Sequence, residues 1–316
     1  MNSLIEIVNI VLPVFLVIGL GYLLGAIGLV GTDASSRLSK LVFYVAAPAL
    51  LFRSAALTPL SKAIDLRAMG SIAGVTALIA FIVYLASFRS SPSRRGVLAQ
   101  GALRSNMVFV GLPVIDNAFG SEVLGPAAVF VGFMVPVYNL LAVLVLALPH
   151  HAEKPGDRGL WKKAALDVLR NPLILGSVTG VAFSALGLTA PTSIDKSLEL
   201  LARMALPAAL LSVGASMDVG RVRAELSPAV AISAIKLIAY PALVYICLGM
   251  LDVTWLERQF VVLICAAPTA VVSAIMAQEM KGDEQLAASI VIGTTVGSLF
   301  TISAWIVFLR LVGQGA

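Results

Sequence analysis

Residues 100–114 read QGALRSNMVFVGLPV and residues 261–270 read VVLICAAPTA, two apolar helical segments that each contain a proline. Proline lacks the backbone N–H and its ring clashes with the carbonyl four residues earlier, so a helix is kinked or interrupted there. We therefore predict breaks at Pro113 and Pro268. In hydrocarbon, the backbone groups freed by a break must be satisfied by protein or must line a wet cavity. If these segments lie in a membrane, the breaks mark a place where a solute can bind.

The composition of the chain indicates that these segments do lie in a membrane. The 316 residues are 59% hydrophobic and 12% charged, whereas soluble domains are about 45–50% apolar and about 25% charged. The lipid bilayer is therefore the partner of most of the chain, and no soluble domain of useful size remains. The net charge of +5 comes from basic residues in short connectors. The positive-inside rule produces this pattern on its own, so we do not expect nucleic-acid binding.

Ten apolar windows approach the length of roughly 20 residues that a membrane-spanning helix needs. We predict an all-α polytopic membrane protein with ten transmembrane helices. The windows are 4–28, 37–57, 68–88, 95–120, 122–148, 168–189, 194–216, 228–250, 258–280 and 285–311. No Lys or Arg precedes the first window, which therefore lacks the basic start of a cleavable signal peptide and should be retained.

The two halves of the chain match when they are overlaid with a shift of 159 residues. The matched positions are Pro13 with Pro172, Gly21 with Gly180, Gly28-Leu29 with Gly187-Leu188, Pro48-Ala49 with Pro207-Ala208 and, after a slightly shorter connector, Leu112-Pro113 with Ala267-Pro268. Each half holds an odd number of helices, so the second half must be inverted. We predict a first repeat at 1–148, a cytoplasmic connecting loop at 149–167 and a second repeat at 168–316. Inverted repeats are typical of secondary transporters.

The distribution of Lys and Arg between connectors predicts the orientation of the chain. With the N-terminus outside, the cytoplasmic connectors hold thirteen of these residues: Arg37, Lys40, Arg89, Arg94, Arg95, Lys154, Arg158, Lys162, Lys163, Arg170, Arg221, Arg223 and Lys281. The outer connectors and the tail hold five: Lys62, Arg67, Lys196, Arg258 and Arg310. We therefore expect a cell (inner) membrane protein with both termini on the outer side.

The electrostatics of the two breaks favour an anion. A half-helix that starts at a break directs unpaired N–H groups and the positive end of its dipole into the cavity. Breaks at matching positions of two repeats indicate a binding site at mid-membrane. Single prolines elsewhere, such as Pro136 and Pro241, are expected only to kink their helices.

Three motifs resemble one known family. They are RSNxxFxGLP at 104–113, LVFYxxxPALLF at 41–52 and KLxxxP at 236–241. The first is similar to the signature of the auxin efflux carrier family, which includes plant PIN-type auxin exporters and bacterial malonate and malate permeases. The similarity runs the length of the chain and is weak in the connecting loop.

The resemblance implies a fold in which the fourth and ninth helices cross at their breaks. It also implies an elevator mechanism, with the first, second, sixth and seventh helices as a scaffold and the remainder carrying the substrate. A homodimer through the same four helices and a co-transported proton or sodium ion are further expectations.

We place the substrate at the crossing. An Asn amide in a membrane helix is either a ligand or a link between helices, and we predict Asn106 and Asn139 as ligands. Lys236 lies deep in its window, where it either neutralises a carboxylate or pairs with backbone carbonyls at a break. Arg104 is expected to act as an entrance charge. The predicted substrate-binding residues are Arg104, Asn106, Gly111, Leu112, Pro113, Tyr138, Asn139, Lys236, Ala267, Pro268 and Thr269.

The acidic residues are the carriers of any ion coupling, and all seventeen fall at helix ends or in connectors. Asp116 and Glu279 come closest to the interior and are the coupling candidates. No paired-Asp cluster of the sodium/proton antiporter kind is present. Glu199 and Arg203 have the i,i+4 spacing of an intrahelical ion pair, and Arg53 is expected to extend its side chain to the outer interface.

The sequence contains no signature of an enzyme. There is no Walker lysine loop, no His within a window and no Asp-rich metal motif, so we expect no catalytic residue, cofactor or metal site. His150 and His151 are expected in a solvated turn of the connecting loop. Cys247 and Cys265 lie in apolar windows without Cys-x-x-Cys spacing, which indicates inert core thiols.

The working hypothesis is a secondary carrier of small organic anions, namely mono- or dicarboxylates or auxin-like acids. A sodium-coupled bile-acid-type symporter of related fold is the alternative. It should place acidic and Gln or Asn sodium ligands near the crossing, and the ninth window holds Gln259 and Gln278 with no carboxylate between them. The sequence does not exclude a channel or a sensor.

Overall fold

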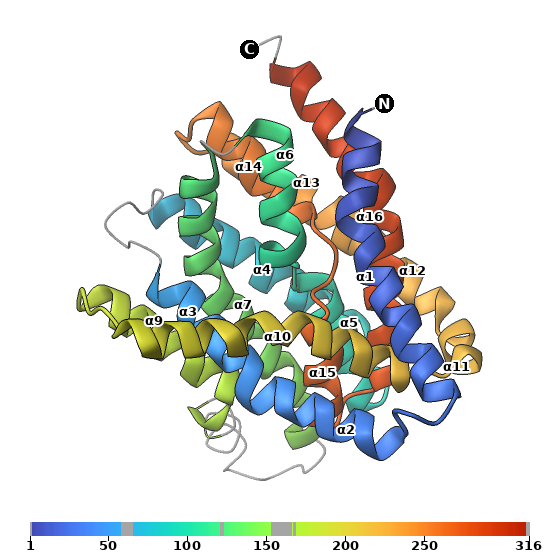
Figure 1. Ribbon diagram of the computed structural model, residues 1–316. Coiled ribbons are helices and arrows are strands. Elements are labelled where there is room, and N and C mark those ends of the chain that lie inside the picture. Colours follow the sequence, from blue (N-terminus) through green and yellow to red (C-terminus); the bar gives the residue numbers. More distant parts are fainter. Residues whose placement is uncertain (1, 58–65, 121–122, 153–165, 167–168, 314–316) are drawn as a thin grey trace.

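The computed structural model describes residues 2–57, 66–120, 123–152, 166 and 169–313, and the elements in this part of the chain are helical (Figure 1). The described residues form no β-strand, so the all-α prediction is confirmed. By length and composition, six segments are able to cross a membrane: Asp33–Ala56, Arg67–Ala86, Gly125–Pro149, Thr192–Ala215, Leu226–Gly249 and Glu284–Gly313. Shorter apolar helices occupy Phe15–Ala26, Met107–Phe119 and Pro172–Ala185.

Helical residues cover most of each of the ten predicted windows. In the first half they form α1 (Asn2–Ala26), α2 (Thr32–Leu41), η1 (Val42–Ala46), α3 (Ala47–Ala56), α4 (Leu66–Ala86), α5 (Pro92–Leu103), η3 (Met107–Gly111), α6 (Leu112–Phe119) and α7 (Leu124–Ala152). In the second half they form α9 (Pro172–Ala185), α10 (Thr192–Ala215), α11 (Val219–Ala224), α12 (Leu226–Ala234), η5 (Ile235–Ala239), α13 (Tyr240–Gly249), α14 (Trp255–Ala266), α15 (Val272–Glu279) and α16 (Glu284–Gly313).

Two connectors differ from the prediction. α7 continues through Pro149 to Ala152, so the backbone of His150 and His151 belongs to the last turn of this helix and not to a loop. Proline removes one helical hydrogen bond without preventing the following residues from staying helical. Residues 153–165 and 167–168 of the connecting loop lie outside the described residues. The short helix α11 (Val219–Ala224) was not predicted, because its sequence carries no apolar window.

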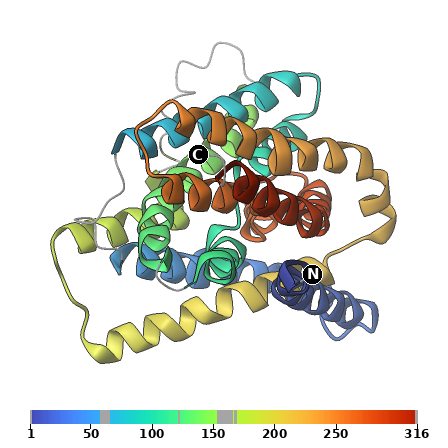
Figure 2. The same ribbon diagram turned by 90° about the horizontal axis from the view of Figure 1, so that it is seen from above.

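Four helices, α1, α3, α9 and α10, pack against one another, and Figure 2 shows α1 and α10 along one edge of the molecule. Small residues allow the backbones of membrane helices to approach closely. A Cβ atom at Gly25 of α1 would lie 2.8 Å from the carbonyl oxygen of Ala215, and one at Gly176 of α9 would lie 2.6 Å from that of Pro48. Glycine at these positions therefore sets the close packing of the group, which we call the edge layer.

The remaining helices surround the two interrupted segments. α5 packs on α4 and α7, α12 packs on α16, and α14 packs on α13 and α16. This second group, the core bundle, holds the broken helices described below.

Each π-helical turn of the described chain is followed by a proline. η1 precedes Pro48, η3 precedes Pro113 and η5 precedes Pro241. A π turn widens the helix, which relieves the clash between the proline ring and the preceding carbonyl. The carbonyl of Leu237, four residues before Pro241, accepts a hydrogen bond from the Trp305 indole at 3.0 Å. The group that loses its usual helical donor at Pro241 is therefore satisfied by α16.

Two glycines that match in the sequence overlay also match in conformation. Gly28 follows α1 and Gly187 follows α9, with φ of 77° and 62°. Glycine adopts this left-handed conformation without the steric cost of a side chain, and it commonly ends helices in this way. The first helix of each half therefore ends in the same manner.

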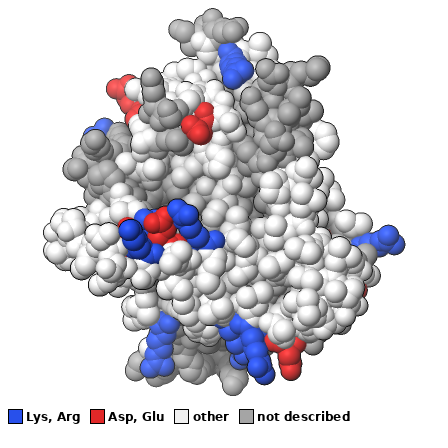
Figure 3. Space-filling view, viewed as in Figure 1, with Lys and Arg blue, Asp and Glu red and all other residues white. Residues whose placement is uncertain are grey.

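The surface has the character of a protein in lipid. The described start of α1 and end of α16 lie at the same end of the molecule, and α2 lies at the opposite end (Figure 1). Figure 3 shows Lys and Arg at the end where α2 lies and one cluster of basic and acidic side chains on the face between, which is otherwise largely uncharged. Large apolar side chains such as Leu16 and Phe300 are exposed. Soluble monomers rarely expose large apolar patches, whereas a surface that contacts lipid does so without cost.

Candidate functional site

The first broken helix is interrupted before its proline. α5 ends at Leu103, residues 104–106 are not helical, and the chain resumes as η3 and α6. Pro113 lies at the start of α6, seven residues beyond Asn106. The prediction of a break at Pro113 is therefore wrong in position, because the π turn η3 accommodates the proline. The interruption falls on the polar triplet 104–106.

The second broken helix is interrupted at its proline, and it meets the first. α14 ends at Ala266, Pro268 lies in the gap, and α15 begins at Val272. Ser105 and Thr269 form an antiparallel bridge. The backbone N–H of Asn106 donates to the carbonyl of Pro268 at 2.7 Å. The two gaps thus satisfy part of each other's freed backbone groups, as burial in an apolar medium requires.

Thr269 is part of this junction and not of a ligand surface. Its hydroxyl donates to the carbonyl of Gly101 at 2.8 Å, and its N–H donates to the hydroxyl of Thr294 at 3.1 Å. The residue is 1% exposed. Both polar groups are already satisfied, so Thr269 holds the gap together.

A cavity of about 60 Å³ opens beside the first gap. It lies between the edge layer and the core bundle. The lining residues are Leu50, Leu51, Arg104, Ser105, Asn106, Met107, Val108, Phe109, Val135, Tyr138, Asn139, Leu206, Ala270, Val271 and Val272. Pockets for small molecules combine apolar walls with a few polar groups. The cavity fits this description.

The Asn106 side chain lines the cavity without a hydrogen-bond partner among the described residues. It is 5% exposed, and its amide makes no hydrogen bond to any residue that the structure describes. The amide atoms are open to the cavity, since Ser273 Oγ is the side-chain N or O atom of the described residues that is both fully enclosed and without a partner. An amide left in this condition beside a cavity is available to a ligand.

Arg104 brings a positive charge to the same wall. One terminal nitrogen donates to Oδ1 of Asn139 at 2.7 Å, and the other contacts the sulfur of Met276. Asn139 in turn donates to the hydroxyl of Ser177 at 3.0 Å. This chain of hydrogen bonds joins the first gap to α7 and to α9 of the edge layer. It orients Arg104 without neutralising it.

Two helix starts face the cavity. Met107 and Val108 are the first two residues of η3. Val271 precedes α15, and Val272 is its first residue. In the described part of the chain these four N–H groups have no acceptor. The starts of helices carry unpaired N–H groups and the positive dipole end, a combination that binds anions.

No acidic side chain in the described part of the chain opposes this positive potential. Among the described residues, neither Asp nor Glu is fully buried, and none lines the cavity. Asp116 is exposed on α6, and Glu279 is half-buried at the end of α15. The two coupling candidates therefore lie away from the cavity.

Lys236, in contrast, does not line the cavity. It is 0% exposed, and its ammonium donates to the carbonyl of Cys265 at 2.6 Å and to the hydroxyl of Ser105 at 2.8 Å. Of the two alternatives for this residue, the contacts match pairing with a backbone carbonyl at a break.

The predicted site residues thus separate into two groups. Arg104, Asn106, Tyr138 and Asn139 line the cavity. The predicted residues that do not line it are Gly111, Leu112, Pro113, Lys236, Ala267, Pro268 and Thr269.

The prediction missed the apolar wall. Leu50 and Leu51 were visible in the motif at 41–52, and Leu206 precedes the repeat-matched Pro207. It also missed Ser105, which lies inside the quoted RSN triplet.

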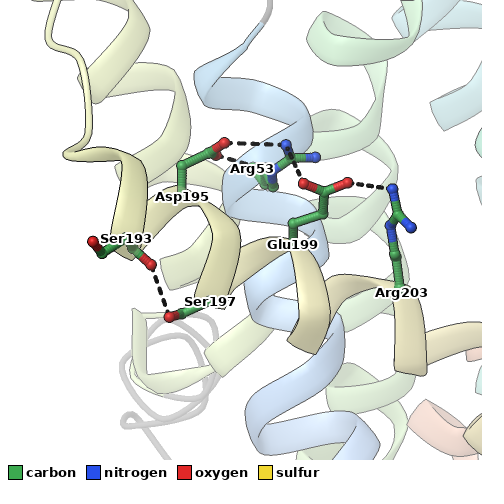
Figure 4. Close-up of polar contacts among 6 residues, drawn as sticks. All are labelled: Arg53, Ser193, Asp195, Ser197, Glu199 and Arg203. Carbon is green, nitrogen blue, oxygen red and sulfur yellow. Dashed lines mark hydrogen bonds and ion pairs between the residues drawn. The ribbon is translucent and has the colours of Figure 1, made fainter.

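Arg53 and Arg203 are held in an ion-pair cluster away from the cavity (Figure 4). Arg53 pairs with Asp195 at 3.0 Å and with Glu199 at 3.3 Å, which joins α3 to α10. Glu199 also pairs with Arg203, as the i,i+4 spacing predicted. Arg53 therefore does more than extend to the interface, because two acids on the neighbouring helix bind it.

Comparison with known proteins identifies the family. The family model described as membrane transport protein matches residues 6–306. A transporter of Methanothermobacter thermautotrophicus is 29% identical over 303 residues, which cover 95% of this chain and 97% of that protein. A Rhizobium meliloti protein, provisionally named a malonate transporter, is 26% identical over 316 residues and 96% of each chain.

The fold is also found among solved structures. The sodium proton antiporter of Methanocaldococcus jannaschii superimposes with a TM-score of 0.56 at 12% identity, over 97% of this chain and 99% of that chain. This likeness concerns the fold alone. The family match, in contrast, spans nearly the whole sequence and includes the motifs around the first gap, so the chain belongs to the membrane transport protein family, the auxin efflux carriers that its motifs resemble.

Proposed function

We propose that this membrane transporter carries small organic anions and binds them in the cavity beside the first gap. The observation that carries the proposal is the free amide of Asn106 next to the guanidinium of Arg104, on a wall without acidic side chains. A carboxylate accepts hydrogen bonds from both groups and offsets the buried charge.

The energetics favour an anion over a neutral solute. A buried charge without a counter-charge is costly, and a partner with good hydrogen-bond geometry offsets that cost. Arg104 has no acidic partner among the described residues. Each hydrogen bond to a charged group contributes about 1.5–3 kcal/mol, so an anion gains from Arg104, from Asn106 and from the helix starts together.

The shape of the cavity favours a solute with an apolar part. Leu50, Leu51, Val135 and Leu206 give the cavity an uncharged part of its lining. Mono- and dicarboxylates and auxin-like acids fit this combination. The provisional name of the Rhizobium meliloti relative makes malonate the first compound to test.

The proposed architecture is that of two inverted five-helix repeats, 1–148 and 168–316, whose broken helices cross. The left-handed Gly28 and Gly187 at matched positions support it, as does the antiparallel bridge between the gaps. The position of the cavity between edge layer and core bundle supports an elevator, in which the bundle moves against α1, α3, α9 and α10. A homodimer through those helices remains part of the proposal.

The proposed orientation has both termini on the outer side of the cell membrane. The shared end of α1 and α16, and the Lys and Arg at the opposite end, support it. Ion coupling through Asp116 or Glu279 receives no support from their positions.

Counterflow of labelled malonate into proteoliposomes tests the proposal. Accumulation of label against preloaded malonate is expected of a carrier and not of a channel. Arg104→Gln should abolish it, whereas Arg223→Gln, an exposed residue far along the chain, should not. If label equilibrates without accumulation, or if other carboxylates also fail to exchange, the proposal is wrong.

A further inference from the structure

The ammonium of Lys236 forms hydrogen bonds to both broken helices. Lys236 lies in η5, in the π turn before Pro241. Its ammonium contacts the end of α14 through the Cys265 carbonyl and the first gap through the Ser105 hydroxyl. The Tyr240 ring lies 4.8 Å away on another side. The group is completely buried and has no acidic partner in the described chain.

The Cys265 carbonyl needs such a donor. In an uninterrupted helix it would accept the N–H of Thr269, four residues on. That N–H instead donates to the hydroxyl of Thr294 at 3.1 Å. Cys265 is one residue from the end of α14, where freed carbonyls and the negative dipole end favour a cation. Lys236 and the Ser105 hydroxyl, the latter at 3.1 Å, supply its hydrogen bonds.

Carbonyl oxygens at the ends of interrupted helices are the groups with which broken-helix transporters coordinate Na⁺. In this chain the Cys265 carbonyl and the Ser105 hydroxyl at such a place both bind the ammonium of Lys236, a cation that belongs to the protein itself. The third neighbour, an aromatic face, also favours a cation.

We propose that Lys236 is the resident cation of the helix junction, a positioning residue that orders the two gaps so that the carrier needs no Na⁺ to form its anion site. The proposal rests on the proposed function only in placing the anion site beside the same gaps. The ammonium acts through Ser105, whose neighbours Arg104 and Asn106 line the cavity.

Chemical rescue tests this role. Lys236→Ala removes three methylenes and the ammonium, which n-propylammonium replaces atom for atom. Lys236→Met fills the same space with an uncharged chain. The midpoint of thermal unfolding, Tm, is measured on purified protein without any anion substrate, in choline, n-propylammonium or sodium chloride at equal ionic strength.

We expect wild-type Tm to be equal in choline and in sodium. Lys236→Ala should have a lower Tm in choline, and n-propylammonium at roughly tenfold its dissociation constant should recover about half of the loss or more. Lys236→Met should show no recovery. A merely structural loss of packing would respond to neither salt, so selective rescue identifies the cation site.

Three results would overturn the proposal: Tm of Lys236→Ala equal to that of wild type, equal effects of n-propylammonium on both variants, or a wild-type Tm that depends on sodium. If Lys236→Ala does not fold, the wild-type protein decides. Its affinity for malonate should agree within about twofold between choline and sodium, and a need for sodium contradicts the proposal. Because the rescue is measured without malonate, absence of malonate binding would remove the proposed substrate and leave the cation role standing.

Discussion

The backbone N–H of Asn106 donates to the carbonyl of Pro268 at 2.7 Å, across two helices that are separated by more than half of the chain. This bond fixes the first gap through the main chain, so the Asn106 side chain is not needed to hold the junction. The backbone of Asn106 therefore holds the junction, whereas its side-chain amide is free beside the cavity. This division makes the site testable by substitutions that leave the fold intact.

Asn106→Ala should weaken anion binding without unfolding the protein. The loss of one hydrogen bond to a charged ligand costs about 1.5–3 kcal/mol, which is roughly a tenfold to hundredfold loss of affinity. Tm without ligand should stay unchanged, since the Asn106 amide holds no other described residue in place. Isothermal titration with malonate and differential scanning fluorimetry measure the two effects.

The matched control for this change is Asn117→Ala, because Asn117 is exposed on α6 and does not line the cavity. It should bind malonate as wild type does. Equal affinities of the Asn106 and Asn117 variants would contradict the site.

Substitution of Arg104 should separate charge from geometry. Arg104→Lys keeps the charge and loses the planar fork that contacts Asn139, so we expect partial loss of anion affinity. Arg104→Gln removes the charge, and we expect the larger loss together with a weaker dependence of affinity on ionic strength. Titrations at low and high salt give both quantities. Identical behaviour of the two variants would show that the charge of Arg104 does not act on the ligand.

Trp305→Phe should lower stability and leave anion binding unchanged. The change keeps an aromatic ring, smaller than the indole, and removes the donor to the Leu237 carbonyl at 3.0 Å, at a cost of about 1–3 kcal/mol for the unsatisfied group. Trp255→Phe is the matched control, because its indole N–H makes no hydrogen bond to a residue in the described part of the chain. The Tm of both variants is measured by thermal unfolding. Equal Tm values would mean that the hydrogen bond from Trp305 to the Leu237 carbonyl does not stabilise the protein.

The stability of the protein should decline on acidification through the Arg94–Glu225 pair. Arg94 donates to both carboxylate oxygens of Glu225 at 2.6 Å, and this hydrogen bonding lowers the pKa of Glu225 below its ordinary value of 4.5. A depressed pKa contributes stability above the unfolded value, and that contribution is lost as pH falls through the folded value. Both side chains are partly exposed, so the effect should be modest, about 1 kcal/mol or less.

Unfolding of wild type and Glu225→Gln between pH 7 and the acid range measures this contribution. The wild-type protein should be the more stable at neutral pH, and the difference should disappear below pH 4.5. A difference that grows on acidification would have the wrong sign.

The sequence predicts the helical elements well because a helix surrounded by lipid must be apolar over most of its length, and this pattern is visible in the sequence. It predicts less of their interruptions. Pro268 lies within its gap, but Pro113 lies beyond its gap, since the π turn η3 takes up the proline. A π turn depends on how neighbouring helices pack, and no residue pattern in one segment specifies it.

The polar half of the cavity was more predictable than its apolar half. Arg104, Asn106 and Asn139 are rare residue types in a membrane helix, and they stand out for that reason. Leu50, Leu51 and Leu206 line the same cavity, but a leucine in a membrane segment usually faces lipid or core. Only the packing of α3 and α10 against the gap distinguishes them. The contact between Lys236 and the Cys265 carbonyl likewise requires η5, α14 and the gap after α5 to pack together, which no single segment of the sequence specifies.

The most direct test of an anion site at the gap compares malonate with malonamide, its uncharged diamide of similar shape, by isothermal titration to wild-type protein and to Asn106→Ala. We predict that malonate or another carboxylate of a small panel binds wild type, that its neutral amide does not, and that the substitution weakens binding by roughly tenfold or more. Binding of malonamide as tight as that of malonate, or an affinity for the carboxylate that Asn106→Ala leaves unchanged, would contradict the account.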